Sequence, residues 1–166
     1  PERGIAERGI SVENVKRSFG AAHAVRDVSF TARAGAVTGL VGPNGSGKTT
    51  LLLMLASLLR PDAGTIRIHG LDPSTSTAKV RAQLGWMPDS LGAWPSLSVR
   101  DTLITTARLY DLPRAAAEAR AAPLLTRVGL SGLADVQARV LSRGQKQLLG
   151  LARALVPEPC VLLLDE

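Results

Sequence analysis

A glycine-rich run at residues 42–49 has the composition of a phosphate-binding loop. It reads Gly42-Pro43-Asn44-Gly45-Ser46-Gly47-Lys48-Thr49, fits the pattern G-x-x-x-x-G-K-[ST], and is followed by Thr50. Glycines allow a tight turn whose backbone N–H groups point at an anion, and the start of the next helix adds partial positive charge. Lys48 would contact the β- and γ-phosphates, and the Thr49 hydroxyl would bind Mg²⁺. We therefore predict that residues 42–50 bind the phosphates of a nucleotide.

Two carboxylates follow an apolar run at the other end of the sequence. The continuous apolar run 161–164 predicts a buried parallel strand, and Asp165 and Glu166 come directly after it. Ligands of parallel sheets bind beyond the carboxyl ends of the strands. Asp165 is therefore predicted to hold Mg²⁺ and Glu166 to orient or deprotonate an attacking water. Together with the glycine-rich loop, these residues predict hydrolysis of a nucleoside triphosphate, with Lys48 and Glu166 as the catalytic side chains.

The elements that must position these residues alternate along the sequence. The apolar run 36–41 predicts a strand leading into the loop, and 48–59, apolar nearly all round, predicts a buried helix. Further strands are expected at 10–15, 25–31, 65–69 and 85–87, and further helices at 74–84, 99–110, 114–128 and 144–155, with Pro123 a possible break. The alternation predicts an α/β fold, with a nearly strandless helical insertion at about 90–145.

Composition excludes several classes of protein. The chain has 166 residues, 45% of them hydrophobic and 20% charged, which is typical of a single globular domain. One cysteine, Cys160, excludes a disulfide framework, and we expect it in the core. The longest apolar stretch, 51–59, is much shorter than the roughly 20 residues of a membrane span. The net charge of +6 comes from scattered residues, so no direct nucleic-acid partner is expected.

A third motif lies between the loop and the acidic strand. Leu141-Ser142-Arg143-Gly144-Gln145 precedes a predicted helix, and by themselves Ser142 and Gly144 would be read as a helix cap. The pentapeptide resembles the LSGGQ signature of the nucleotide-binding subunits of ABC transporters, with Arg143 in place of the usual glycine. The order of the motifs is also similar, and the resemblance runs from about residue 10 to the last residue.

The resemblance implies a particular fold and site. The fold would be a P-loop NTPase (RecA-like) core with an N-terminal antiparallel β subdomain and a helical subdomain at about 90–145. Residues 1–166 would form one partial domain that lacks its C-terminal strands. The cofactors would be ATP and Mg²⁺, with ATP held between two subunits in a head-to-tail dimer. Ser142, Gly144 and Gln145 would then contact the γ-phosphate bound to the second subunit.

Two further positions match the family. Phe19 stands where the family has an aromatic residue that stacks on adenine, and the alternative is a core residue at a strand end. Asp89 stands where the family has the glutamine of the Q-loop, so it would lie near Mg²⁺ or serve only as a turn residue. Pro88-Asp89, together with the Leu-Ser-Arg-Gly sequence at 141–144, is similar to the bacterial daunorubicin-type drug exporters.

The resemblance also implies partners and a location. These are a second ATP-binding subunit and a membrane permease, at the cytoplasmic face of a bacterial membrane. The family carries a histidine after the catalytic glutamate, but both histidines here, His23 and His69, precede Glu166. We therefore expect residues 1–166 to be a fragment that is inactive in isolation. Two alternatives stay open: an ABC-type ATPase without a permease, acting on ribosomes or DNA, and a degenerate module that only binds nucleotide.

Overall fold

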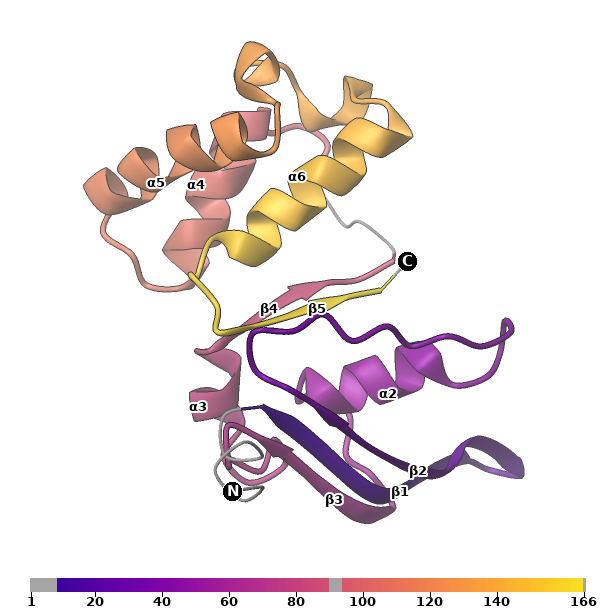
Figure 1. The fold of residues 1–166 in the computed structure, drawn as a ribbon. Coiled ribbons are helices and arrows are strands. Elements are labelled where there is room, and N and C mark those ends of the chain that lie inside the picture. The colour runs from indigo at the N-terminus through magenta and orange to yellow at the C-terminus, as the bar shows by residue number, and fades with distance from the viewer. Residues whose placement is uncertain (1–8, 90–93, 166) are drawn as a thin grey trace. The chain divides into compact units, whose positions relative to one another are not determined.

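The computed structural model describes residues 9–89 and 94–165, and its helices and strands are labelled in Figure 1. The chain divides into two units, Pro1–Ala82 and Gln83–Glu166. Both units combine strands with helices, so the predicted α/β class is confirmed. The prediction of a single domain with a helical part at about 90–145 stays a prediction.

The first unit is built on an antiparallel sheet. Its strands are β1 (Ile10–Phe19), β2 (Ala22–Ala32) and β3 (Ala63–Ile68), in the order β2-β1-β3. A tight turn at Gly20, whose φ is 58°, joins β1 to β2. The predicted strands at 10–15, 25–31 and 65–69 are therefore confirmed, and the first two are longer than predicted. The antiparallel subdomain expected at the N-terminus is present.

Helix α2 (Lys48–Leu55) follows the glycine-rich loop and buries Leu51, Leu52, Met54 and Leu55. The prediction of a buried helix is confirmed, but its predicted end at residue 59 is wrong. The chain leaves the helix because Ser57 adopts a φ of 60°, and the amides of Leu58 and Leu59 both turn back to the Leu53 carbonyl. Helix α3 (Thr77–Arg81) is likewise shorter than predicted.

The strand predicted at 36–41 is absent from the described residues. The segment carries no strand pairing, and the side chains of Val37 and Val41 are fully exposed. A strand exists only when a neighbour pairs with its backbone, and the strands of the first unit pair with one another instead. The prediction of a strand at 36–41 is therefore wrong for the described residues.

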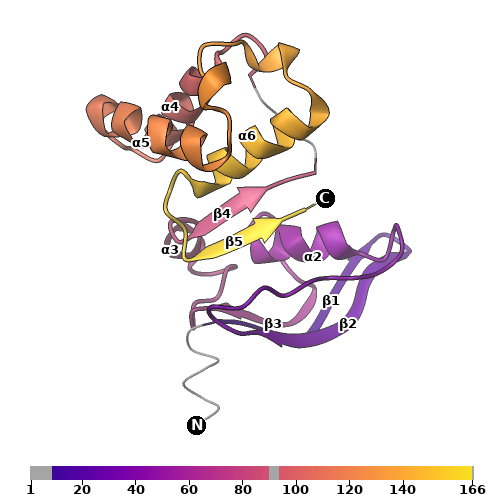
Figure 2. The same ribbon diagram turned by 45° about the horizontal axis from the view of Figure 1, so that its top comes forward.

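In the second unit, β4 (Leu84–Met87) and β5 (Val161–Leu164) form a parallel pair, which Figure 2 shows running in one direction. The prediction that residues 161–164 form a parallel strand is confirmed. The prediction that this strand is buried is wrong, because Leu162 and Leu164 are 37% and 44% exposed. A two-stranded sheet leaves one edge of β5 without a neighbour among the described strands. Cys160, expected in the core, is exposed just before β5.

The helices of the second unit are α4 (Val99–Leu109), α5 (Arg114–Arg127) and α6 (Arg143–Leu155), with short 3₁₀ turns η1 (Ser131–Leu133) and η2 (Ala138–Val140) (Figure 1). They share one hydrophobic core, to which α4 contributes Leu103, α5 contributes Leu125 and α6 contributes Leu149. Helix α5 continues through Pro123 without a break. No helix in residues 9–89 and 94–165 is long and apolar enough to cross a membrane.

Candidate nucleotide-binding site

The glycine-rich loop folds around the side chain of Lys48. The Lys48 ammonium donates hydrogen bonds to the carbonyls of Gly42, at 2.8 Å, and Pro43, at 3.0 Å. The Ser46 amide also donates to the Pro43 carbonyl, at 3.2 Å. The loop is therefore a closed turn with the lysine charge held directly against its backbone.

Glycine is required at position 47 for two separate reasons. Its φ of 89° lies in the left-handed region, which L side chains rarely adopt. A Cβ there would also collide with the backbone carbonyl of Ala24 in β2. Gly45 has a similar φ of 80°, but a Cβ there would meet open space. The close approach of the loop to β2 thus depends on Gly47.

The start of α2 has no side-chain cap. Gly47 occupies the N-cap position, and the first turn contains no acidic residue. The partial positive charge of this helix end is therefore not offset by the helix's own side chains, and Lys48 adds a full charge to it. Amides, an ammonium group and the hydroxyls of Thr49 and Thr50 form a donor set that fits a polyphosphate anion with Mg²⁺. The residues present thus fit the ligands predicted from the sequence.

Asp165 and Asp89 follow the carboxyl ends of neighbouring parallel strands. Asp165 is buried after β5, and its N–H donates to the Met87 carbonyl of β4 at 2.9 Å. Asp89 is exposed two residues after the end of β4. Because Met87 pairs with Leu164, the two carboxylates belong to the same edge of this sheet. Glu166, the predicted catalytic glutamate, lies outside the described residues.

The described residues contain no cluster of three or more His, Cys, Asp or Glu side chains that could hold a metal ion. A Mg²⁺ ion bound near the loop would take oxygen ligands from hydroxyls, water and phosphate, since Mg²⁺ keeps several waters and usually takes only one or two carboxylates. The predicted ligands Thr49, Asp165 and Asp89 therefore remain candidates.

Two of the signature residues, Ser142 and Gln145, form a reciprocal helix cap. Ser142 is the N-cap of α6: its hydroxyl accepts from the Gln145 amide at 3.3 Å, and the Gln145 side chain accepts from the Ser142 amide at 2.9 Å. The cap reading of the sequence is therefore confirmed for Ser142, whereas Gly144 lies in the first turn of the helix and Gln145 is the second capping residue. Among residues 9–89 and 94–165, no acceptor is found for the amides of Arg143 and Gly144. Both residues are exposed, and a Cβ at Gly144 would meet nothing within 4 Å.

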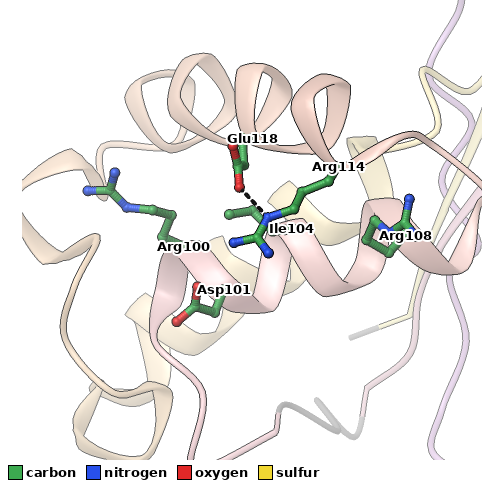
Figure 3. Close-up of a pocket in the computed structure, with 6 residues that line it drawn as sticks. All are labelled: Arg100, Asp101, Ile104, Arg108, Arg114 and Glu118. Atoms are coloured by element: carbon green, nitrogen blue, oxygen red, sulfur yellow. Dashed lines mark hydrogen bonds and ion pairs between the residues drawn. The ribbon is translucent and has the colours of Figure 1, made fainter.

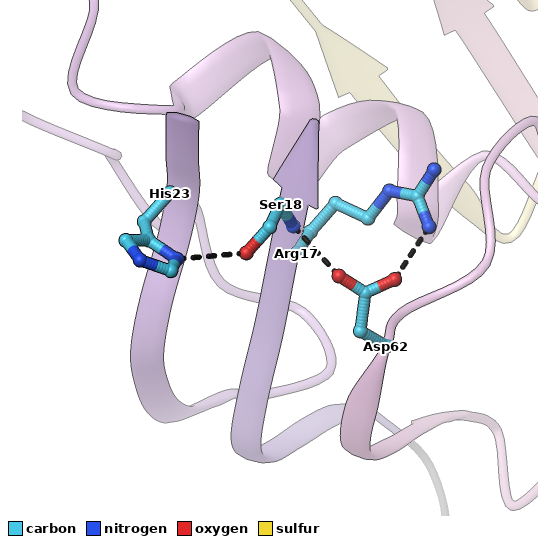
Figure 4. A network of polar contacts seen from close by, with 4 residues as sticks. All are labelled: Arg17, Ser18, His23 and Asp62. Atoms are coloured by element: carbon cyan, nitrogen blue, oxygen red, sulfur yellow. Dashed lines mark hydrogen bonds and ion pairs between the residues drawn. The ribbon is translucent and has the colours of Figure 1, made fainter. Parts of the chain in front are cut away.

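Phe19 ends β1 with half of its surface exposed, so it is not the core aromatic that the sequence left as an alternative. The Arg17 guanidinium lies over its ring, 4.8 Å from the centroid. Arg17 is held in turn by Asp62, which Figure 4 shows between the Arg17 side chain and the Ser18 backbone. Sequence reasoning missed Arg17 and Asp62. The available signal was the spacing of Arg17 and Phe19, since residues two apart on a strand share a face.

A family model described as "ABC transporter" matches residues 25–166, which is most of the chain.

The chain belongs to the ABC transporter family.

Relatives of this ABC transporter chain include ATP-binding proteins of both import and export systems. It is 42% identical to the sulfate/thiosulfate import ATP-binding protein CysA of Thermosynechococcus vestitus over 158 residues, which cover 95% of this chain and 47% of that protein. It is 44% identical to the Nod factor export ATP-binding protein I of Burkholderia lata over 158 residues, 95% of this chain and 52% of that protein. A probable multidrug ABC transporter ATP-binding protein, YbhF of Escherichia coli, and the linearmycin resistance ATP-binding protein LnrL of Bacillus subtilis are also among its relatives.

A solved structure confirms the ABC fold. The chain matches cbiO1 of Clostridium perfringens, described as part of the ABC transporter complex cbiONQ, with a TM-score of 0.83 and 30% identity. The match covers 95% of this chain and 64% of cbiO1. The chain thus spans about half the length of the curated relatives named above. The predicted resemblance to ABC transporter ATP-binding subunits is confirmed.

A basic pocket on α4 and α5 was not predicted from the sequence (Figure 3). It has a volume of about 510 Å³ and is lined by Arg100, Asp101, Ile104, Arg108, Arg114 and Glu118. Each arginine already has a partner in this ABC chain. Arg114 pairs with Glu118 at 2.8 Å, which raises the pKa of Arg114, Arg108 donates to the Leu112 carbonyl, and Arg100 pairs with Asp135. Because each of these arginines is paired within the chain, their charges give no indication of a ligand in the pocket.

Proposed function

We propose that the protein containing this chain binds and hydrolyses MgATP to power an ABC-type membrane transporter. The observation that carries the proposal is the loop 42–49, closed around Lys48 at an uncapped helix start, within a chain of the ABC transporter family. A helix start whose charge is not offset by its own side chains is suited to a multiply charged anion.

Each loop residue has a proposed part in nucleotide binding. The backbone amides of residues 42–50 donate to phosphate oxygens, and Lys48 neutralises charge on the β- and γ-phosphates. The Thr49 hydroxyl is a proposed Mg²⁺ ligand, with Asp165 acting through water and Asp89 as a further candidate. Bound Mg²⁺ would stabilise negative charge that develops on the phosphates. Phe19 offers an exposed ring for stacking on the base.

Hydrolysis is proposed to depend on Glu166 and Lys48. Glu166 would orient or deprotonate the attacking water, while Lys48 stabilises the charge on the transferred phosphoryl group. A binding-only function is the second candidate, and Asp89 is the observation in its favour. The family has a neutral glutamine at this position, whereas Asp89 adds an exposed carboxylate that is shorter by one methylene.

The signature is proposed to act on a second subunit in a head-to-tail homodimer. The Arg143 and Gly144 amides and the exposed Ser142 hydroxyl would face the γ-phosphate bound to the partner, and Gln145 would keep Ser142 in place. Arg143 adds positive charge beside this contact, which favours an anion there. The dimer would therefore form when ATP bridges the two subunits.

The proposed transporter is an exporter that pairs with a separate permease at the cytoplasmic face of a bacterial membrane. Its support is the resemblance of residues 88–89 and 141–144 to drug-exporter ATPases, together with relatives named for export and multidrug transport. CysA, which is named for import, has a similar identity to this chain, so the degree of similarity by itself does not distinguish import from export.

The test is nucleotide binding by the full-length subunit with Lys48→Ala. We expect MgATP affinity to fall at least a hundredfold in equilibrium dialysis, because the variant removes the cation that faces the phosphates. Lys79→Ala, an exposed lysine of α3, is the matched control and should bind as the wild type does. Equal MgATP affinity in the Lys48→Ala variant and the control would refute the assignment of the loop.

A further inference from the structure

The end of β1 holds an arginine and an aromatic ring in direct contact. Arg17 and Phe19 project from the same face of the strand because they are two residues apart. The guanidinium carbon lies 4.8 Å from the centre of the Phe19 ring, within the range of cation–π attraction. One face of the ring is therefore covered by Arg17, while the side chain as a whole stays half exposed.

The position of Arg17 is set by Asp62, which is 45 residues away in sequence. One carboxylate oxygen of Asp62 accepts from the Arg17 guanidinium at 2.6 Å, and the other accepts from the Ser18 amide at 2.7 Å (Figure 4). The Asp62 amide donates in turn to the Lys16 carbonyl at 2.8 Å. Asp62 is thus bound to β1 by its backbone and by both oxygens of its side chain.

Asp62 and the Phe19 ring are the polar and ring contacts of the Arg17 guanidinium among the described residues. The buried Nε of Arg17 has no hydrogen-bond partner in that part of the chain. On the other side of Ser18, its hydroxyl contacts Nδ1 of His23 in β2 at 2.9 Å. The end of β1 that carries Phe19 is therefore held on one side by His23 of β2 and on the other by Asp62, the residue before β3.

We propose that Asp62 and Arg17 act as positioning residues that hold Phe19 as a one-sided platform for the base of a bound nucleoside triphosphate. Arg17 occupies one face of the ring and leaves the other for the base. An aromatic side chain that is already held loses less conformational freedom when it stacks on a ligand, so the pair strengthens binding without touching the nucleotide. The inference rests on the proposed nucleotide-binding function of residues 42–50.

The experiment compares MgATP with inorganic tripolyphosphate, which has no base, by calorimetry on the full-length subunit. Arg17→Ala should weaken MgATP binding about two- to fivefold, in line with an exposed cation–π contact, and leave tripolyphosphate binding unchanged. Arg26→Ala, an exposed arginine of β2, is the matched control and should change neither affinity.

A double variant separates positioning from general support of the fold. In a Phe19→Leu background, which lacks the ring, adding Arg17→Ala should cause no further loss of MgATP affinity. If Arg17→Ala fails to fold, Asp62→Asn replaces it, because this variant keeps an acceptor for the Ser18 amide but removes the ion pair. An equal loss for both ligands, or the same loss with and without the Phe19 ring, would overturn the proposal.

The outcomes for the two proposals are distinct. If the wild type binds neither MgATP nor tripolyphosphate, or if Lys48→Ala changes neither affinity, the proposed function itself fails. If Lys48→Ala abolishes binding of both ligands while Arg17→Ala spares MgATP, only the positioning role is refuted.

Discussion

Helices α2 and α6 differ in how the chain treats the first amides of the helix. Every α-helix begins with amides that lack partners within the helix. At α6, Ser142 and Gln145 supply a reciprocal cap from the chain itself. At α2, Gly47 supplies no side chain, and the turn before it is organised by Lys48 instead. The α6 start is thus partly capped by its own side chains, whereas the α2 start has no side-chain cap, which is consistent with the anion binding proposed for it.

The largest expected effect is on the formation of the proposed dimer, in which the α2 start of one subunit and the α6 start of the other would contact the same ATP. In the full-length subunit, Glu166→Gln should slow hydrolysis and allow ATP to hold a dimer that sedimentation velocity detects. Adding Ser142→Arg should abolish that dimer, because the new side chain fills the space proposed for the γ-phosphate. Ser131→Arg, at the exposed start of η1, controls for added charge and bulk. A dimer that persists in the Ser142→Arg double variant would show that Ser142 has no role across the interface.

The second prediction concerns the α2 start and uses two glycines with similar φ. Gly47→Ala should reduce MgATP affinity at least tenfold and lower the free energy of unfolding by about 3 kcal/mol, because it combines backbone strain with a collision against Ala24. Gly45→Ala meets only the strain, about 1 kcal/mol, since the space around it is open. Denaturant titration and dialysis measure the two effects, and equal losses at both positions would contradict the proposed close approach to β2.

The smallest effect concerns the α6 cap alone. Ser142→Ala should lower the free energy of unfolding by about 1 kcal/mol in urea titration, because the Gln145 amide loses its acceptor. Ser142→Asp, which restores a capping oxygen, should recover most of that loss. No change of stability in the alanine variant would mean that the observed cap contributes nothing, and the contrast between the two helix starts would then disappear.

The helix starts were the most predictable parts of the site because their chemistry is local. The glycines, Lys48 and Thr49 lie within eight residues, and the capping residues Ser142 and Gln145 are three apart. Short-range signals of this kind depend little on the rest of the fold. For the same reason the helices α4, α5 and α6 were predicted to within one residue of their observed bounds, whereas the strands β1 and β2 are longer than predicted.

The errors arose where a feature depends on distant residues. Whether 36–41 forms a strand depends on a neighbour that the segment itself does not encode, and the exposure of Leu162 and Leu164 depends on the uncovered side of β5. The Arg17–Asp62 pair joins positions far apart in the sequence, so no local pattern indicates it. The early end of α2 was missed because Ser57 adopts a positive φ that its residue type does not favour.

The two hydrogen bonds from Lys48 to its own loop bear on where its charge lies when a ligand leaves. The carbonyls of Gly42 and Pro43 compete with any phosphate for the same ammonium group. A hydrogen bond to a charged group contributes about 1.5–3 kcal/mol, so part of what a phosphate gains from the Lys48 charge offsets the loss of these two bonds. When a phosphate departs, the lysine returns to partners that are already in place. In the proposed cycle the loop would therefore keep the lysine charge in place between the departure of one nucleotide and the arrival of the next.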